Sequence, residues 1–100
     1  ALRNRRTEML DGQINYTEVY LKTLREKLGR LQKDAGRFRP YSSDPKAPPI
    51  HENLAKELSD TLDSIIRYEQ TLNDTQARKA KLVTKFEQDI TRFRELKGLN

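Results

Sequence analysis

Few side chains in this chain of 100 residues are suited to chemistry. There is one histidine, His51, and there is no cysteine. A lone histidine forms a metal site or an acid–base pair only where carboxylates converge on it. The carboxylates that follow it show no ligand spacing: they are Glu52, Glu57, Asp60 and Asp63. We therefore expect His51 to cap a helix or to pack against a loop, and we predict no catalytic residue and no metal site.

The glycines do not suggest a ligand site either. All four are isolated in the sequence, whereas a phosphate-binding loop needs several glycines close together. We therefore predict no cofactor and no small-molecule substrate, and we do not expect an enzyme.

Basic residues near the two chain ends form the other group that could bind a ligand. They are Arg3, Arg5, Arg6, Arg78, Lys79, Lys81 and Lys85. The chain carries a formal net charge of +5, and a solvated, solubilising face is the simpler interpretation of this cluster. An anion or lipid patch is the alternative. A nucleic-acid partner is not expected, because the aromatic residues are spaced for helix packing and no nucleic-acid-binding motif is present.

Two long helical patterns must position these side chains. In the first pattern, seam positions from Leu10 to Phe38, all of them apolar except Thr17, follow one another at alternating spacings of four and three. This 3.5-residue period places a narrow apolar stripe along a helix, and such a stripe needs a facing helix. We predict a first long helix over residues 1–39, with a packing seam of Leu10, Ile14, Leu21, Leu24, Leu28 and Leu31.

All four prolines fall within residues 40–49. Proline lacks a backbone donor and disfavours helical geometry in the residue before it, so this stretch is predicted to be a stiff loop. The spacing of Pro45 and Pro48 would also suit an SH3 or WW ligand, but a connector is the favoured interpretation.

A second long helix is predicted over residues 50–98, with Gly98 as its stop. Its packing seam comprises Leu54, Leu58, Ile65, Leu72, Leu82 and Phe86, and Leu62, Ile66, Val83 and Ile90 widen the stripe. Polar residues dominate from Thr75 to Lys81, where the pairing should be loosest.

Charge indicates how the two helices pair. Residues 22–39 hold seven basic and two acidic side chains, whereas residues 50–76 hold two basic and six acidic ones. An antiparallel hairpin places these oppositely charged stretches side by side. Because the second helix is longer, it should extend past the first, which leaves Ile90, Phe93 and Leu96 as an association surface.

The segment HENLAKEL at residues 51–58, together with the basic clusters, resembles parts of BAR-type and F-BAR-type membrane-curving helical dimers. That resemblance implies a basic face, with Arg78, Lys79, Lys81 and Lys85, turned toward anionic lipid.

We predict an all-α, long antiparallel helical hairpin, a coiled coil that associates into a multi-helix bundle. The hairpin is expected to be one domain, with a structural or scaffolding role in protein–protein association. The partner would be a second copy or another helical protein, and the alternative is a BAR-like module on an anionic membrane surface. The chain has no membrane-length apolar run and no secretory signal. We therefore expect an intracellular, cytoplasmic protein and interpret the sequence as an excerpt of a longer one.

Overall fold

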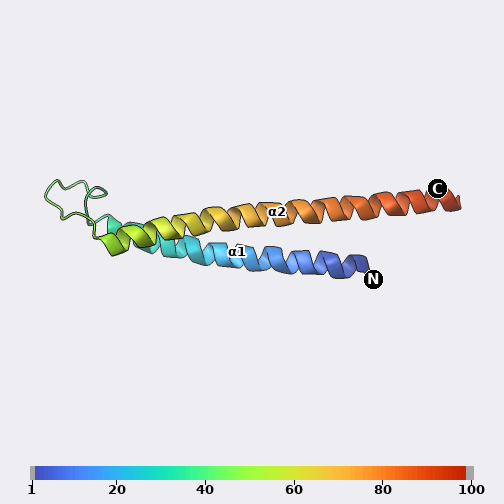
Figure 1. Cartoon of the computed structure of the whole chain (residues 1–100), viewed down its shortest axis with the longest axis horizontal. Helices are drawn as coiled ribbons and strands as arrows, with labels where there is room; N and C mark the ends of the chain where they lie inside the picture. Colours follow the sequence, from blue (N-terminus) through green and yellow to red (C-terminus); the bar gives the residue numbers. More distant parts are fainter. Residues whose placement is uncertain (1, 99–100) are drawn as a thin grey trace.

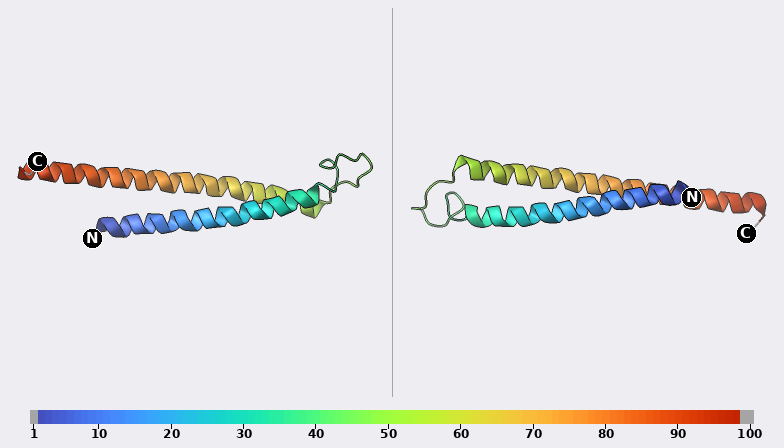
Figure 2. Two further views of the ribbon diagram at one scale, coloured as in Figure 1. Left: turned by 180° about the vertical axis from the view of Figure 1, so that it is seen from behind. Right: turned by 90° about the horizontal axis from the view of Figure 1, so that it is seen from below.

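The computed structural model describes residues 2–98, with side chains from Arg5 onward. It contains two helices, α1 (Leu2–Ala35) and α2 (Glu52–Lys97), and no strand in the described part of the chain. The helices run antiparallel from a loop at one end of the molecule (Figure 1), and the whole chain measures 79 × 20 × 15 Å. The ribbons of α1 and α2 overlap near the loop in Figure 1 and near the start of α1 in the right-hand view of Figure 2. The two helices therefore wind around each other. The predicted antiparallel helical hairpin is therefore confirmed.

Hydrogen bonds between the two ends of the loop set the helix boundaries near the turn. The Arg39 amide donates to the Pro48 carbonyl and the Ile50 amide donates to the Arg39 carbonyl, both at 2.8 Å. The Arg39 Nε also donates to the Ala47 carbonyl at 2.6 Å. These bonds hold both ends of the loop in strand-like contact. For this reason α1 ends four residues before the predicted end at residue 39, and α2 begins two residues after the predicted start at residue 50.

His51 acts as the N-cap of α2. Its Nδ1 accepts a hydrogen bond from the Leu54 amide at 3.4 Å, which satisfies one of the donors left free at a helix start. The ring also packs edge-on against Phe38, with 5.3 Å between the ring centroids. At the other end of α2, Gly98 adopts a left-handed conformation with φ of 67°, which glycine allows without strain. The predicted roles of both residues are confirmed.

The buried side chains form a line along the contact between α1 and α2. Leu21 is the most completely buried of them, with 1% of its surface exposed. Near the loop the cluster consists of Leu31, Ala35, Leu54 and Leu58, and further along it consists of Leu21, Leu24 and Ile65. The hydrophobic stabilisation of the fold therefore comes from one stripe of side chains on each helix. Two helices leave no place for a second layer of buried side chains.

Buried threonines continue this line toward the open end of the hairpin. The Thr17 hydroxyl donates to the Gln13 carbonyl, and the Thr75 hydroxyl donates to the Thr71 carbonyl, each at 2.8 Å. Both bonds run four residues back along the same helix, so the hydroxyl groups are satisfied without a partner on the other helix. The open half of the hairpin is thus held with fewer apolar contacts than the half near the loop.

We predict that Leu24→Ala lowers the free energy of unfolding by about 2 to 5 kcal/mol, because it leaves a cavity in the buried seam. Lys22→Ala is the matched control: it changes an exposed residue of the same helix and should alter stability by less than about 0.5 kcal/mol. Urea denaturation followed by circular dichroism measures both. Equal, small effects for the two variants would show that Leu24 is not part of a packed core.

Candidate interaction surfaces

Two ion pairs and a pair of tyrosines show the register of the helices. Arg25 Nη2 lies 3.0 Å from Glu69 Oε1, and Lys79 Nζ pairs with Asp11 Oδ1. Tyr20 and Tyr68 meet edge to face, with 4.6 Å between their ring centroids. In these pairs the residue numbers sum to roughly 90, so the start of α1 at Leu2 lies beside residue 88 or so of α2.

The residues of the predicted packing seam lie along this contact, with burial that varies along its length. The loop half holds the most deeply buried ones: Leu21, Leu24, Leu31, Leu54, Leu58 and Ile65. Half-buried members are Leu10, Ile14, Leu28, Leu72, Leu82 and Phe86. Most of the half-buried members lie toward the open end, where the polar contacts described above take over.

The end of α2 extends past the start of α1, and we call residues 89–97 the overhang (Figure 1). Ile90 is 40% exposed, Phe93 56% and Leu96 81%. The Phe93 ring makes a cation–π interaction with Lys97 of the same overhang, whose Nζ lies 5.6 Å from the ring centroid. The residues predicted as an association surface therefore stand largely in water.

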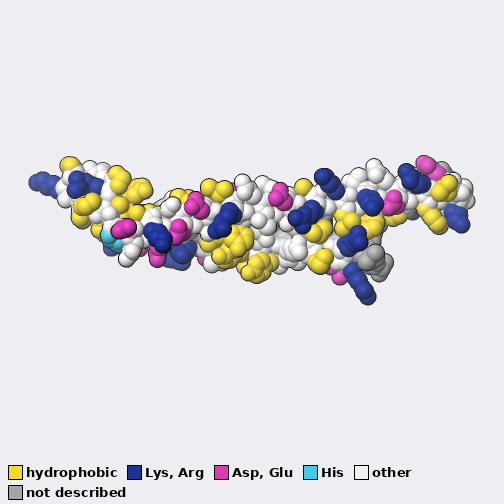
Figure 3. Space-filling view, viewed as in Figure 1, with side chains coloured by type: hydrophobic (Ala, Val, Ile, Leu, Met, Phe, Trp, Pro, Cys, Tyr) yellow, Lys and Arg dark blue, Asp and Glu magenta, His cyan; other side chains and the backbone are white. Residues whose placement is uncertain are grey.

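A second apolar surface was not predicted. Met9 and Tyr16, which are 61% and 70% exposed, line a groove of about 400 Å³ between the helices. The other residues of this tyrosine groove are Gly12, Gln13 and Thr17 from α1 and Thr71 and Thr75 from α2. None of the seven lining residues is charged. A patch of apolar side chains over the middle of the hairpin is visible in Figure 3.

Stacked tyrosines border the tyrosine groove. The rings of Tyr16 and Tyr20 are stacked at 6.4 Å, and Tyr20 in turn meets Tyr68 of α2, so aromatic contacts cross from one helix to the other. The sequence does contain a signal for this surface, because Met9, Gly12, Tyr16 and Val19 follow one another at spacings of three and four beside the main seam.

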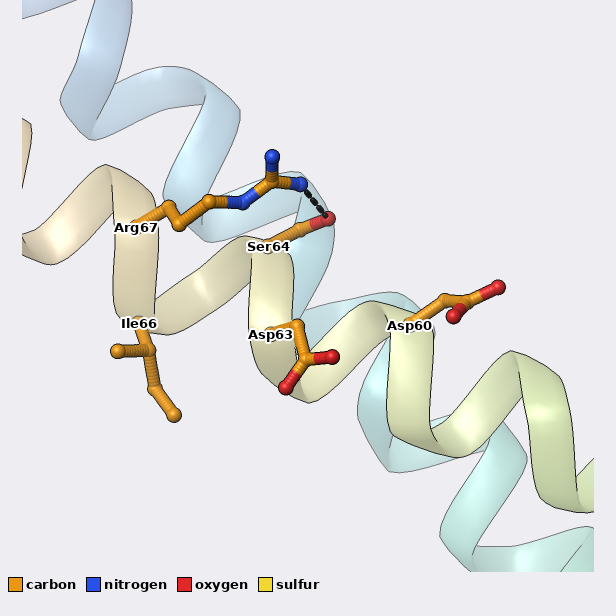
Figure 4. Close-up of a pocket in the computed structure, with 5 residues that line it drawn as sticks. All are labelled: Asp60, Asp63, Ser64, Ile66 and Arg67. Atoms are coloured by element: carbon orange, nitrogen blue, oxygen red, sulfur yellow. Dashed lines mark hydrogen bonds between the residues drawn. The ribbon is translucent and has the colours of Figure 1, made fainter.

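The outer face of α2 holds a shallow depression lined by Asp60, Asp63, Ser64, Ile66 and Arg67 (Figure 4). Arg67 Nη2 donates to Ser64 Oγ at 3.4 Å, while the two carboxylates point away from the helix into solvent. All five residues come from one helix, and no second element encloses them. Among the described residues no group of three or more His, Asp or Glu side chains could hold a metal ion.

The predicted basic patch is only partly available to a ligand. Arg5, Arg6, Arg78, Lys81 and Lys85 are exposed near the open end of the hairpin. Lys79 is half-buried and paired with Asp11, so it serves the contact between the helices. The side chain of Arg3 lies outside the described residues.

No protein-family model, curated protein or solved structure matches this chain. Among the described residues, neither helix combines the length and apolar character needed to cross a membrane. The function is therefore inferred from the surfaces themselves.

We predict that Gly12→Ala, at the floor of the tyrosine groove, raises the free energy of unfolding by about 0.5 to 1 kcal/mol. A Cβ added there meets nothing within 4 Å, and alanine has the higher helix propensity. Gly98→Ala is the matched opposite case, because its φ of 67° strains an alanine. Thermal unfolding followed by circular dichroism should show a higher melting temperature for the first variant and a lower one for the second. A lower melting temperature for Gly12→Ala at a concentration where the chain is monomeric would contradict the open space at this position of the single hairpin.

Proposed function

We propose that this chain is a structural module that mediates protein–protein association, as a scaffolding part of a larger protein or complex. The observation that supports this most strongly is the overhang of α2, which presents Ile90, Phe93 and Leu96 to water in an otherwise charged helix. Large apolar side chains gathered on one exposed surface are typical of an association site.

Burial of the overhang would supply much of the binding free energy. Complete burial of one such side chain contributes about 1.5 to 3 kcal/mol, and the three residues repeat at intervals of three along one side of the helix. This spacing suits a partner that lies along the apolar side of the overhang.

Helix stability gives a second reason for a partner. The overhang is a little over two turns long and lacks any support from α1. The overhang continues α2 and needs no nucleation of its own, but the end of a helix that packs against nothing is free to fray. A partner helix would therefore stabilise the end of α2 and bury its apolar side chains at the same time.

The basic patch supports a second candidate, which is binding to an anionic membrane surface. Arg78, Lys81 and Lys85 are exposed on the part of α2 that leads into the overhang. Each basic side chain near an anionic surface contributes about 1 kcal/mol, and Phe93 and Leu96 could enter the interface between headgroups and acyl chains. This candidate predicts co-sedimentation with vesicles of anionic lipid that is lost in Lys81→Glu/Lys85→Glu.

We predict that Phe93→Asp/Leu96→Asp abolishes association, because the variant places two charges in the proposed contact. If the partner is a second copy, sedimentation velocity at micromolar concentration should show a smaller species than the wild-type chain forms. If the partner is another helical protein, the complex of the two should no longer be seen. Helicity should fall as well, since the overhang loses the packing that stabilises it.

Gln88→Asp/Thr91→Asp is the matched control for this experiment. It adds the same charge to the same stretch of α2, on the face lined by Thr84, Gln88, Thr91 and Glu95. This variant should associate as the wild type does. If Phe93→Asp/Leu96→Asp keeps the wild-type mass but binds anionic vesicles less than the wild-type chain does, the association role is wrong and the membrane candidate is favoured.

A further inference from the structure

The middle of the hairpin carries few charges on both helices at the same level, because Asp74 is the one charged residue among residues 70–77 and residues 12–17 hold none. Residues 12–17 of α1 and residues 70–73 and 75–77 of α2 contain no Asp, Glu, Lys or Arg, although these four types make up 35% of the chain. The tyrosine groove lies in this belt, with Met9 and Tyr16 mostly exposed. A neutral, partly apolar belt in a highly charged rod is suited to contact with another neutral belt.

Charge along α2 indicates the orientation of a partner. Residues 52–76 hold six acidic and two basic side chains, and residues 77–97 hold seven basic and three acidic ones. Two copies packed in the same direction would bring their basic halves together. Two copies packed antiparallel would place the acidic half of each α2 beside the basic half of the other, with the neutral belts in contact at the centre.

One register satisfies these charges residue by residue. If Thr71, which lines the tyrosine groove, lies on a two-fold axis, residue numbers on the paired α2 helices sum to about 142. The facing pairs are then Glu57 with Lys85, Asp60 with Lys81, and Arg67 with Asp74, each occurring twice. All six side chains are exposed. None of them takes part in the ion pairs of Arg25 with Glu69 and of Lys79 with Asp11 within the hairpin.

The same register also covers the overhang. Phe93 of one copy lies level with Pro49 of the other, and Ile90 lies level with the start of α2 at Glu52. Each overhang would pass beside the proline-rich loop of the second copy, where Pro48 and Pro49 are exposed. A single partner thus buries both the tyrosine groove and the overhang.

The contact is long. Residues 52–90 of each α2 overlap in this register, which at about 1.5 Å per residue gives a length of nearly 60 Å. With a helix diameter of about 10 Å, the strip along α2 covers roughly 600 Å² per copy, and the side chains of α1 that line the tyrosine groove add to it. Stable complexes bury about 800 Å² per partner.

We propose that the occupant of the tyrosine groove is a second copy of this chain, packed antiparallel about a two-fold axis at Thr71. This inference rests on the proposed association role and deepens it by naming the partner, the face and the register.

Disulfide trapping tests the register directly, because the natural chain has no cysteine. Thr71→Cys lies on the proposed axis and should form an intermolecular disulfide under mild oxidation, seen as a dimer on non-reducing gels. Asn73→Cys is the matched control, since a residue two positions later points about 200° away around the helix and should stay monomeric. A disulfide in Asn73→Cys but not in Thr71→Cys would overturn the proposed face.

Charge reversal tests the orientation. Glu57→Lys/Asp60→Lys disturbs four of the proposed pairs in a dimer and should weaken dimerisation about tenfold or more at low salt. Addition of Lys81→Glu/Lys85→Glu to the same chain should restore it, because the reversed charges again face opposite charges. Failure to restore dimerisation would contradict the antiparallel register.

The outcomes separate this inference from the proposed function. A dimer that depends on Phe93 and Leu96 but lacks the Thr71→Cys disulfide overturns the register and leaves the association role standing. A wild-type chain that stays monomeric at roughly 100 μM, a concentration that populates even weak dimers, overturns the second copy as partner.

Discussion

The whole structure depends on burying one narrow stripe of side chains on each of two helices. Leu21, Leu24 and Ile65 exclude water along a line, and the buried threonines extend that line where apolar residues run out. Two helices in contact cannot enclose more than this line, so the other faces of both helices remain in water. The rod shape, the exposed overhang and the open tyrosine groove all follow from that limit.

The fold could be predicted from the sequence because its determinants are local and periodic. The heptad spacing of Leu21, Leu24 and Leu31 defined the seam, and the proline-rich stretch located the turn. Gly36 and the prolines predicted the helix ends near the loop only to within a few residues, because the bonds of Arg39 to Pro48 and Ile50 join residues that only the folded turn brings together. Periodicity carries no information about such contacts.

The surfaces were predicted less completely than the fold. The overhang followed from a comparison of helix lengths, which needs only an antiparallel turn and a rise per residue. The tyrosine groove is lined by residues of both helices and by the open space at Gly12. It forms only because these residues lie on the same side of the folded hairpin, and the sequence pattern does not specify that side. The pairing of Lys79 with Asp11 also depends on register, and for that reason one residue of the expected basic patch proved to belong to the contact between the helices.

In the proposed dimer, a second copy covers the faces that the two-helix fold leaves exposed. Small-angle X-ray scattering with in-line light scattering distinguishes the arrangements, because Thr71 lies about 40 Å along α2 from Lys97 and thus near the middle of the 79 Å rod. An antiparallel dimer about that residue should have twice the 11.7 kDa mass of the chain and keep a longest dimension close to 80 Å. A monomer mass, or a dimer nearly twice as long and joined end to end through the overhangs, would contradict the account.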